Sequence, residues 1–147
     1  MRNRDVAKIW NEYYLDAVYK TGGQNKEEGY DCVSMIFTFY EHLGIDIKKY
    51  DKINRNNYLQ YWDGSAEDTI LLKDWALSLG KQIDKPYRNT GDLLICYFKK
   101  NKQWFLSIYL GNDLCSIIPA EQKKIMVCPY SLLKGSIEYI IRVGRNK

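Results

Sequence analysis

The sequence contains a single histidine, His42, and four cysteines that include no Cys-x-x-Cys pair. Zinc centres need closely spaced Cys and His ligands, and this spacing is missing here. We therefore expect no metal and no other cofactor. A hydrolase with a cysteine nucleophile normally takes its base from an imidazole elsewhere in the fold, so the shortage of histidine also limits what a thiol can do.

Long apolar runs are missing as well. No segment reaches the roughly 18 consecutive apolar residues that a membrane-spanning helix needs. The first residues, 1–5, lead directly into an amphipathic pattern without the apolar segment of a secretory signal peptide. These absences predict a protein that is made in a reducing cytoplasm and is not inserted into a membrane.

Charge of one sign is not concentrated in any part of the sequence. The 22 Lys and Arg residues are interspersed with 18 Asp and Glu residues, and the net charge is +4. Nucleic-acid binding needs a clustered basic face, so we expect no nucleic-acid partner. What the chain does have is a hydrophobic content of 46% and an aromatic content of 14%, which predict one packed domain over residues 1–147.

Apolar residues at helical spacing predict helices in the first part of the chain. They are expected over residues 4–19, from Cys32 to Leu43, and after Ser65 as far as Leu79. Glycines follow the second and third of these segments, as is common at helix ends. The stretch 45–64 is polar and is predicted to be irregular.

After Pro86 the pattern changes to short apolar runs separated by turn residues. Helices followed by antiparallel strands indicate the α+β class, with helices packed on a sheet of four to six antiparallel strands. The helical part is predicted over about 4–80 and the sheet part over about 90–143. Strands are expected at 92–98, 104–110, 114–118, 125–127 and 137–143.

An Asp31-Cys32 pair stands where a loop gives way to the second predicted helix. A helix N-terminus carries partial positive charge and unpaired N–H groups, both of which favour a thiolate. Cys32 is therefore placed as a cysteine nucleophile would be. The remaining cysteines lie in apolar runs and are expected to be buried and reduced: Cys96, Cys115 and Cys128.

Six short motifs occur in order along residues 5–143. They are Gly22-Gly23, Tyr30-Asp31-Cys32, Leu43-Gly44-Ile45, Thr90-Gly91-Asp92-Leu93, Ile108-Tyr109-Leu110-Gly111-Asn112 and Tyr139-Ile140-Ile141-Arg142. Together they resemble the NlpC/P60 family of papain-like cysteine peptidases, in particular the version found in bacteriophage tail proteins. The resemblance implies a papain-like fold. In active members it implies cleavage of cell-wall stem peptides by a Cys, a His and a third polar residue that orients the His.

The resemblance assigns the catalytic His to the position of Phe105, so the usual base is missing. It assigns the third residue to Ser116 or its neighbour Ile117. His42 lies ten residues after Cys32 on the same predicted helix, or about 15 Å along its axis, which is too far for proton transfer. We therefore expect Cys32 to be a vestigial nucleophile position.

Three functions are compatible with these residues. The first is a degenerate, inactive domain that is a structural or assembly component of a phage tail, in its tip, hub or baseplate. Such a protein would reside in the virion after assembly in the host cytoplasm and would contact other tail or hub proteins. The aromatic residues Tyr58, Tyr61 and Trp62 form a candidate protein contact in this case.

The second function is an active cysteine peptidase or amidase of cell-wall peptides, with Cys32 as nucleophile and an unconventional base. Peptidoglycan is a partner only in this case. The third is a small toxin-like or immunity-like effector on the same fold, whose toxicity on expression would depend on Cys32.

Overall fold

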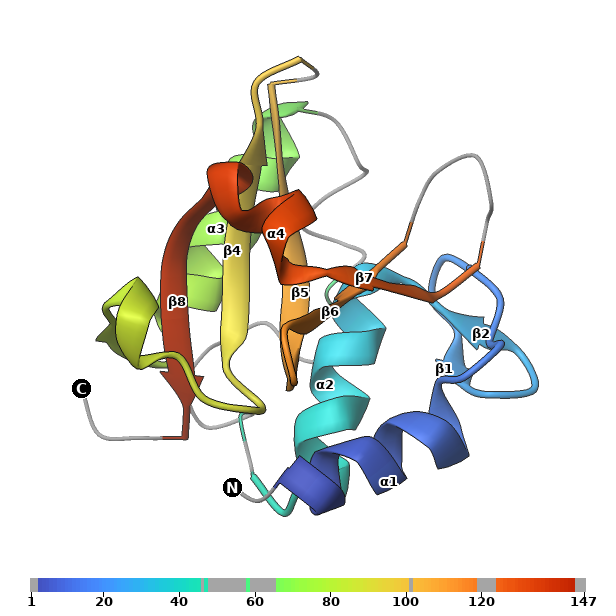
Figure 1. Ribbon diagram of the computed structural model, residues 1–147. Coiled ribbons are helices and arrows are strands. Elements are labelled where there is room, and N and C mark those ends of the chain that lie inside the picture. The colour runs from blue at the N-terminus through green and yellow to red at the C-terminus, as the bar shows by residue number, and fades with distance from the viewer. Residues whose placement is uncertain are drawn as a thin grey trace.

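The computed structural model describes residues 3–45, 47, 58, 66–100, 102–118 and 124–144. Its helices and strands follow one another along the chain as shown in Figure 1. They are α1 (Asn3–Tyr13), β1 (Gln24–Asn25), β2 (Gly29–Tyr30), α2 (Cys32–His42), α3 (Ala66–Leu77), β3 (Gly80–Ile83), η3 (Lys85–Tyr87), β4 (Leu93–Phe98), β5 (Gln103–Gly111), β6 (Leu114–Ile117), β7 (Met126–Pro129), α4 (Tyr130–Leu133), η4 (Lys134–Ser136) and β8 (Ile137–Val143).

The main sheet has six strands in the order β3-β8-β4-β5-β6-β7, and every neighbouring pair is antiparallel. In its centre, β4 and β5 pair from Leu93 opposite Ile108 to Phe98 opposite Gln103. The short strands β1 and β2 form a separate pair just before α2. The α+β prediction is confirmed, as is the expectation of helices packed on an antiparallel sheet.

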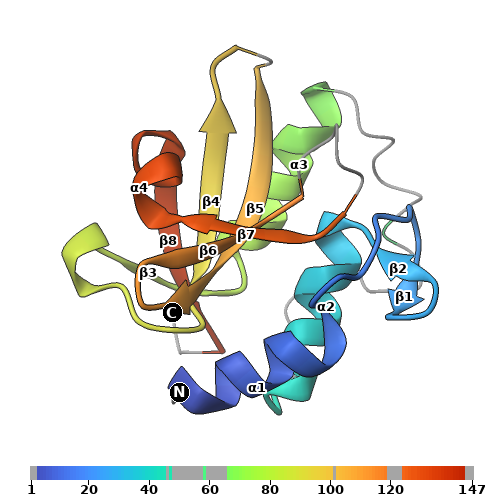
Figure 2. The same cartoon turned by 45° about the vertical axis from the view of Figure 1, so that its right-hand side comes forward.

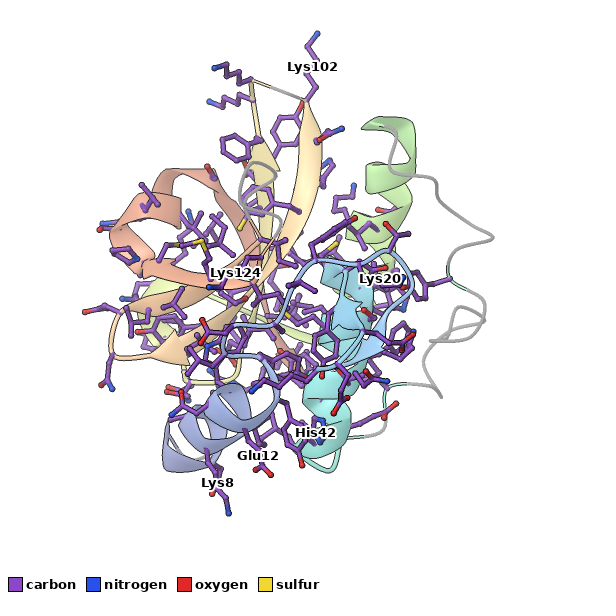
Figure 3. The ribbon with its side chains drawn as sticks, turned by 90° about the vertical axis from the view of Figure 1, so that its right-hand side faces the viewer. Lys8, Glu12, Lys20, His42, Lys102 and Lys124 are labelled. Atoms are coloured by element: carbon purple, nitrogen blue, oxygen red, sulfur yellow. The ribbon has the colours of Figure 1, made fainter. Side chains whose placement is uncertain are left out.

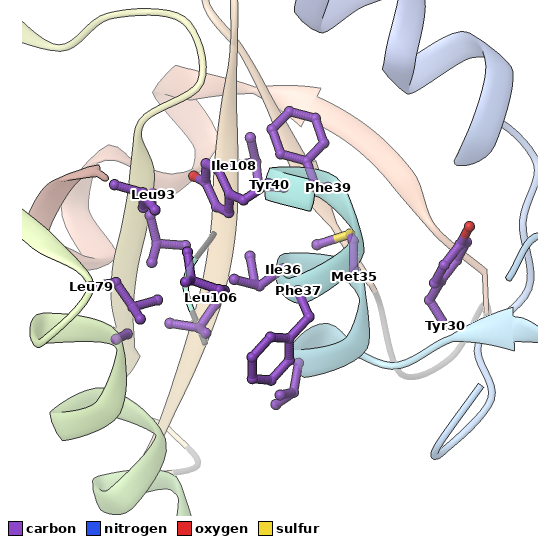
Figure 4. Close-up of a cluster of buried hydrophobic side chains, with 14 of the residues drawn as sticks. Tyr30, Met35, Ile36, Phe37, Phe39, Tyr40, Leu79, Leu93, Leu106 and Ile108 are labelled. Atoms are coloured by element: carbon purple, nitrogen blue, oxygen red, sulfur yellow. The ribbon is translucent and has the colours of Figure 1, made fainter. Parts of the chain in front are cut away.

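The sheet buries side chains on both faces. Alternate residues of β4 point to opposite sides, so Leu93 belongs to a first cluster and Leu94 to a second. The first cluster lies between the sheet and the helices α1, α2 and α3, and Figure 4 shows side chains of α2 meeting those of β4 and β5. The second cluster includes Tyr130 and Leu133 of α4, which covers the other face (Figures 1 and 2).

The first helix is shorter than its periodicity predicts. α1 ends at Tyr13, whereas the apolar spacing predicted a helix as far as residue 19. Asp16 has a positive φ of 64°, which a helix does not allow. The next residues then form isolated bridges, Val18 with Lys124 and Tyr19 with Tyr30. The apolar side chains of this segment therefore pack from an irregular turn rather than from a helix.

The sheet begins earlier in the chain than predicted. Gly80, expected only as a helix stop, is the first residue of β3 and lies opposite Val143 of β8. A Cβ added at Gly80 would lie 2.1 Å from the carbonyl oxygen of Arg142, so this close approach of two backbones requires glycine. The other strands of this six-stranded sheet and α2 match their predicted ranges to within two residues, whereas the short strands β1 and β2 lie in a predicted loop.

Most of the predicted irregular stretch 45–64 and the predicted N-cap Ser65 lie outside the described residues. No helix in the described parts of the chain is long and apolar enough to span a membrane.

Candidate functional site

The start of α2 is fixed by hydrogen bonds around Asp31. Its Oδ1 atom accepts from the backbone N–H groups of Val33 at 3.0 Å and Ser34 at 2.8 Å. The Ser34 hydroxyl accepts in turn from the N–H of Asp31 at 3.0 Å. This reciprocal capping box satisfies donors that would otherwise be left unpaired at the helix end. It makes Cys32 the first helical residue, as the sequence predicted.

The second carboxylate oxygen of Asp31 connects two other segments to this helix. Its Oδ2 atom accepts from the backbone N–H of Gly22 at 2.8 Å and from the hydroxyl of Tyr58. Asp31 is only 5% exposed, so these bonds are shielded from water. Burial and the bond to Asp31 hold the pKa of the Tyr58 hydroxyl well above its usual range. The Tyr58 side chain is therefore a neutral donor at the base of the site.

The Cys32 thiol is half-buried and is not activated by its position. Burial, followed by the negative charge of the Asp31 carboxylate, raises its pKa to about 12. A backbone hydrogen bond acts in the opposite direction but is outweighed. The effect of the helix N-terminus expected from the sequence is thus overcome by desolvation and by the neighbouring acid. At neutral pH the side chain is a thiol.

Phe105, the position to which the resemblance assigns the missing base, does not share a cluster with Cys32. It lies on β5 opposite Cys96, and its ring centroid is 5.2 Å from that of Phe98. It packs against the second cluster, whereas its neighbour Leu106 belongs to the first, against which Cys32 packs. Because successive side chains of β5 point to opposite faces of the sheet, Phe105 and Cys32 pack against different clusters.

The only histidine lies at the opposite end of α2 from the thiol. The exposed ring of His42 stacks on Tyr13 of α1 with centroids 3.7 Å apart, and Figure 3 shows it beside the first helix. This confirms the predicted position of His42 in the last turn of its helix. The imidazole links α1 to α2 and is not the base of this site.

The candidates for the third polar residue, Ser116 and Ile117, lie on β6. Ser116 is fully buried; its hydroxyl accepts from the N–H of Ile108 at 2.8 Å, and its carbonyl accepts from the Ser107 hydroxyl at 2.6 Å. These bonds join β5 to β6. Ile117 packs against the second cluster, like Phe105. The described residues thus place Ser116 in strand pairing rather than beside an imidazole.

Of the aromatic residues predicted to contact another protein, only Tyr58 is described, and the structure contradicts its predicted surface position. Tyr58 is 1% exposed, with its ring centroid 6.3 Å from that of Phe37. Its side chain therefore faces the interior and is not a surface contact. Tyr61 and Trp62 lie outside the described residues. Sequence reasoning missed the role of Tyr58 as a partner of Asp31, because nothing in the pattern pairs positions 27 residues apart.

Metal ligands do not gather in the described parts of the chain: they contain no group of three or more His, Cys, Asp or Glu side chains that could hold an ion.

The fold and the capped cysteine at the start of α2 agree with a match to a protein family. The model of the NlpC/P60 family matches residues 16–135. This chain therefore belongs to the NlpC/P60 family. No curated protein sequence matches it significantly.

Solved NlpC/P60 structures share its architecture at low sequence identity. The NlpC/p60 domain of the peptidoglycan hydrolase SagA is 17% identical, with a TM-score of 0.63 over 97% of this chain and 100% of that one. An NlpC/P60 family protein from Bacillus cereus is 17% identical, with a TM-score of 0.65 over 98% of this chain but only 41% of that one. The peptidoglycan hydrolase RipB from Mycobacterium tuberculosis is 16% identical, with a TM-score of 0.58 over 98% and 65% of the two chains. Likeness at this level establishes the fold.

Proposed function

We propose that this chain is a catalytically inactive NlpC/P60 domain with a structural or assembly role in a bacteriophage tail, in the tip, hub or baseplate region. The observation that carries the proposal is geometric: the chain's one imidazole lies at the other end of α2 from Cys32. Burial also raises the pKa of the thiol. The tail location rests on the likeness of the motif set to the tail-associated version of the family.

The site lacks what both halves of the reaction need. A thiol whose pKa is raised in this way stays protonated at neutral pH. Amide hydrolysis also needs an acid that protonates the leaving amine, and the phenyl ring at Phe105 supplies none. Loss of a single member of a catalytic triad typically lowers the rate by about 10⁴-fold or more. Both deficits apply to this site.

An assembly role needs a surface that contacts other proteins. Three large apolar side chains are exposed on β6 and β7, at one end of the sheet: Leu114 at 41%, Met126 at 39% and Val127 at 37%. Exposed apolar groups of this kind are typical of contact surfaces. In this proposal these three side chains, rather than Tyr58, contact other tail or hub proteins. The protein then resides in the virion.

The proposal is tested by thiol reactivity and peptidoglycan cleavage measured side by side. Iodoacetamide labelling at pH 6, followed by mass spectrometry, is expected to modify Cys32 no faster than the three other cysteines. Wild-type protein and the variant Cys32→Ser are expected to release no muropeptides above background. Rapid selective labelling of Cys32, together with cleavage that Cys32→Ser abolishes, would instead establish an active cysteine peptidase with an unconventional base.

Two variants make the test sharper. Phe105→His is expected to show no muropeptide cleavage, because Phe105 packs against a different cluster from Cys32 and Ser116 is engaged in strand pairing. Cys32→Ser is expected to leave the yield of assembled tails unchanged. Cleavage by the first variant, or failure of assembly with the second, contradicts the proposal.

A further inference from the structure

A pocket of about 530 Å³ lies on the α4 side of the molecule. Its walls come from η3, the turn between β5 and β6, and the α4–η4 segment. None of the residues that surround Cys32 lines it. The polar side chains that line it are Lys85, Arg88, Asp113, Tyr130, Ser131 and Lys134.

The guanidinium of Arg88 is held rigidly in the wall of this pocket. It lies 3.9 Å from the centroid of the Tyr130 ring, and its two terminal nitrogens donate to the Lys85 carbonyl at 3.1 Å and to Asp113 Oδ1 at 3.2 Å. Its Nε atom is buried and has no hydrogen-bond partner among the described residues. Arg88 fixed in this way keeps a positive charge in the wall of the pocket.

The positive charge of the pocket is only partly compensated. Arg88 is paired with Asp113, while Lys85 and Lys134 make no ion pair with any described residue. Two ammonium groups are thus left over in the lining of one small pocket. Lys is a compact point charge well suited to phosphate oxygens, and a phosphomonoester carries close to two negative charges at neutral pH.

We propose that this pocket binds a small organic phosphomonoester. The phosphate group lies between Lys85 and Lys134 and accepts a further hydrogen bond from the Ser131 hydroxyl. The apolar part of the ligand packs on Pro86 and Pro129, which form the remaining walls. A carboxylate carries a single charge and would leave one ammonium uncompensated. The site is independent of Cys32, so it stands whether or not the domain is catalytic.

The test is a titration at pH 7.5 and low salt with inorganic phosphate and with phenyl phosphate, followed by ¹H–¹⁵N correlation spectra. Saturable shifts are expected in the amides of η3 and α4, with phenyl phosphate binding more tightly than phosphate. The double variant Lys85→Gln/Lys134→Gln is expected to weaken binding by at least about tenfold. Both side chains are exposed, so the fold is kept, and the spectrum itself verifies this.

The matched control is Lys81→Gln/Lys102→Gln, which removes the same charge from exposed lysines on β3 and at the hairpin tip (Figure 3). This control is expected to bind as the wild type does. Shifts that do not saturate, or equal weakening of binding in the two double variants, would show that phosphate is attracted nonspecifically to surface lysines. Either result would contradict a specific site in this pocket. Tighter binding of glutarate than of phenyl phosphate would overturn the phosphomonoester assignment.

Discussion

At the scale of single residues, Asp31 has two effects on Cys32 that act in opposite directions. By capping α2 it makes the cysteine the first residue of a helix, the position expected to favour a thiolate. By placing a buried carboxylate next to the sulfur it contributes to raising the pKa of that same thiol. The motif that identifies the family therefore does not by itself make the cysteine reactive.

The variant Asp31→Asn separates these two effects. The amide oxygen of Asn can still accept the capping bonds, whereas its nitrogen cannot accept from the Gly22 N–H as Oδ2 does. Because the negative charge is removed, the pKa of Cys32 is expected to fall. The alkylation rate at pH 8.5 should rise roughly three- to tenfold, while burial still holds the pKa above that of a free cysteine. Iodoacetamide kinetics with mass spectrometry measure this. Asp113→Asn, at a distant turn, is the control, and equal rates in the two variants would exclude the charge effect.

At the scale of elements, the start of β4 and the end of β8 are joined by an ion pair whose carboxylate is buried. Asp92 is 3% exposed and accepts from Arg142 Nε at 3.1 Å, from its terminal nitrogen at 3.0 Å and from the N–H of Asn89 at 2.7 Å. Arg142 also donates to the Tyr87 carbonyl of η3 at 3.0 Å. The motifs that contain Asp92 and Arg142 are therefore in contact, and this contact stabilises the fold.

Arg142→Gln is expected to lower the free energy of unfolding by about 3 kcal/mol, because it leaves the Asp92 carboxylate buried without its partner. Urea denaturation measures this, with the exposed Glu138→Gln of the same strand as the control. The double variant Asp92→Asn/Arg142→Gln should be less destabilised than Arg142→Gln alone, since it removes the unpaired charge. A loss below about 1 kcal/mol in the single variant would contradict this account.

The elements also show how far sequence patterns reach. Continuous apolar runs bounded by turn residues predicted β4, β5, β6 and β8 closely. The strand β3 was missed because Gly80–Ile83 is short and carries exposed polar side chains at the end of the sheet. α1 was predicted too long because the buried Tyr14 and Ala17 continue its apolar spacing beyond the point where the helix stops.

At the scale of the whole molecule, the parts that could not be predicted are contacts between distant segments. The sequence placed Cys32 at a helix start and identified Phe105 as the departure from the family pattern. It could not show that Tyr58 donates to Asp31, nor that Arg88 stacks on Tyr130, because neither pair follows a local period. The surroundings of Asp31 and the proposed phosphate pocket are therefore visible only in the tertiary structure. The fold class, in contrast, can be predicted from local patterns in the sequence.

Three thiols, of which Cys96 and Cys115 are buried and Cys32 is half-buried, predict how the stability of the whole molecule depends on pH. Burial raises the pKa of Cys32 and of Cys115 to about 12, and that of Cys96 also lies above its usual range. In the unfolded chain these thiols ionise near pH 8.5. Above this pH the unfolded state releases protons that the folded state retains, so the free energy of unfolding falls as pH rises. Each such thiol contributes a slope of up to about 1.4 kcal/mol per pH unit.

Denaturation in urea at pH 7 to 10.5 under reducing conditions measures this slope. The free energy of unfolding is expected to be level up to about pH 8 and to fall steeply above pH 9. Cys115→Ala should lower the stability at pH 7 but flatten the alkaline decline by the share of one thiol. Val6→Ala, which removes buried methyl groups from the first cluster, should lower stability without altering the slope. If both variants show the same alkaline slope, or if the wild type stays level to pH 10.5, buried thiols do not control the alkaline limit of this fold.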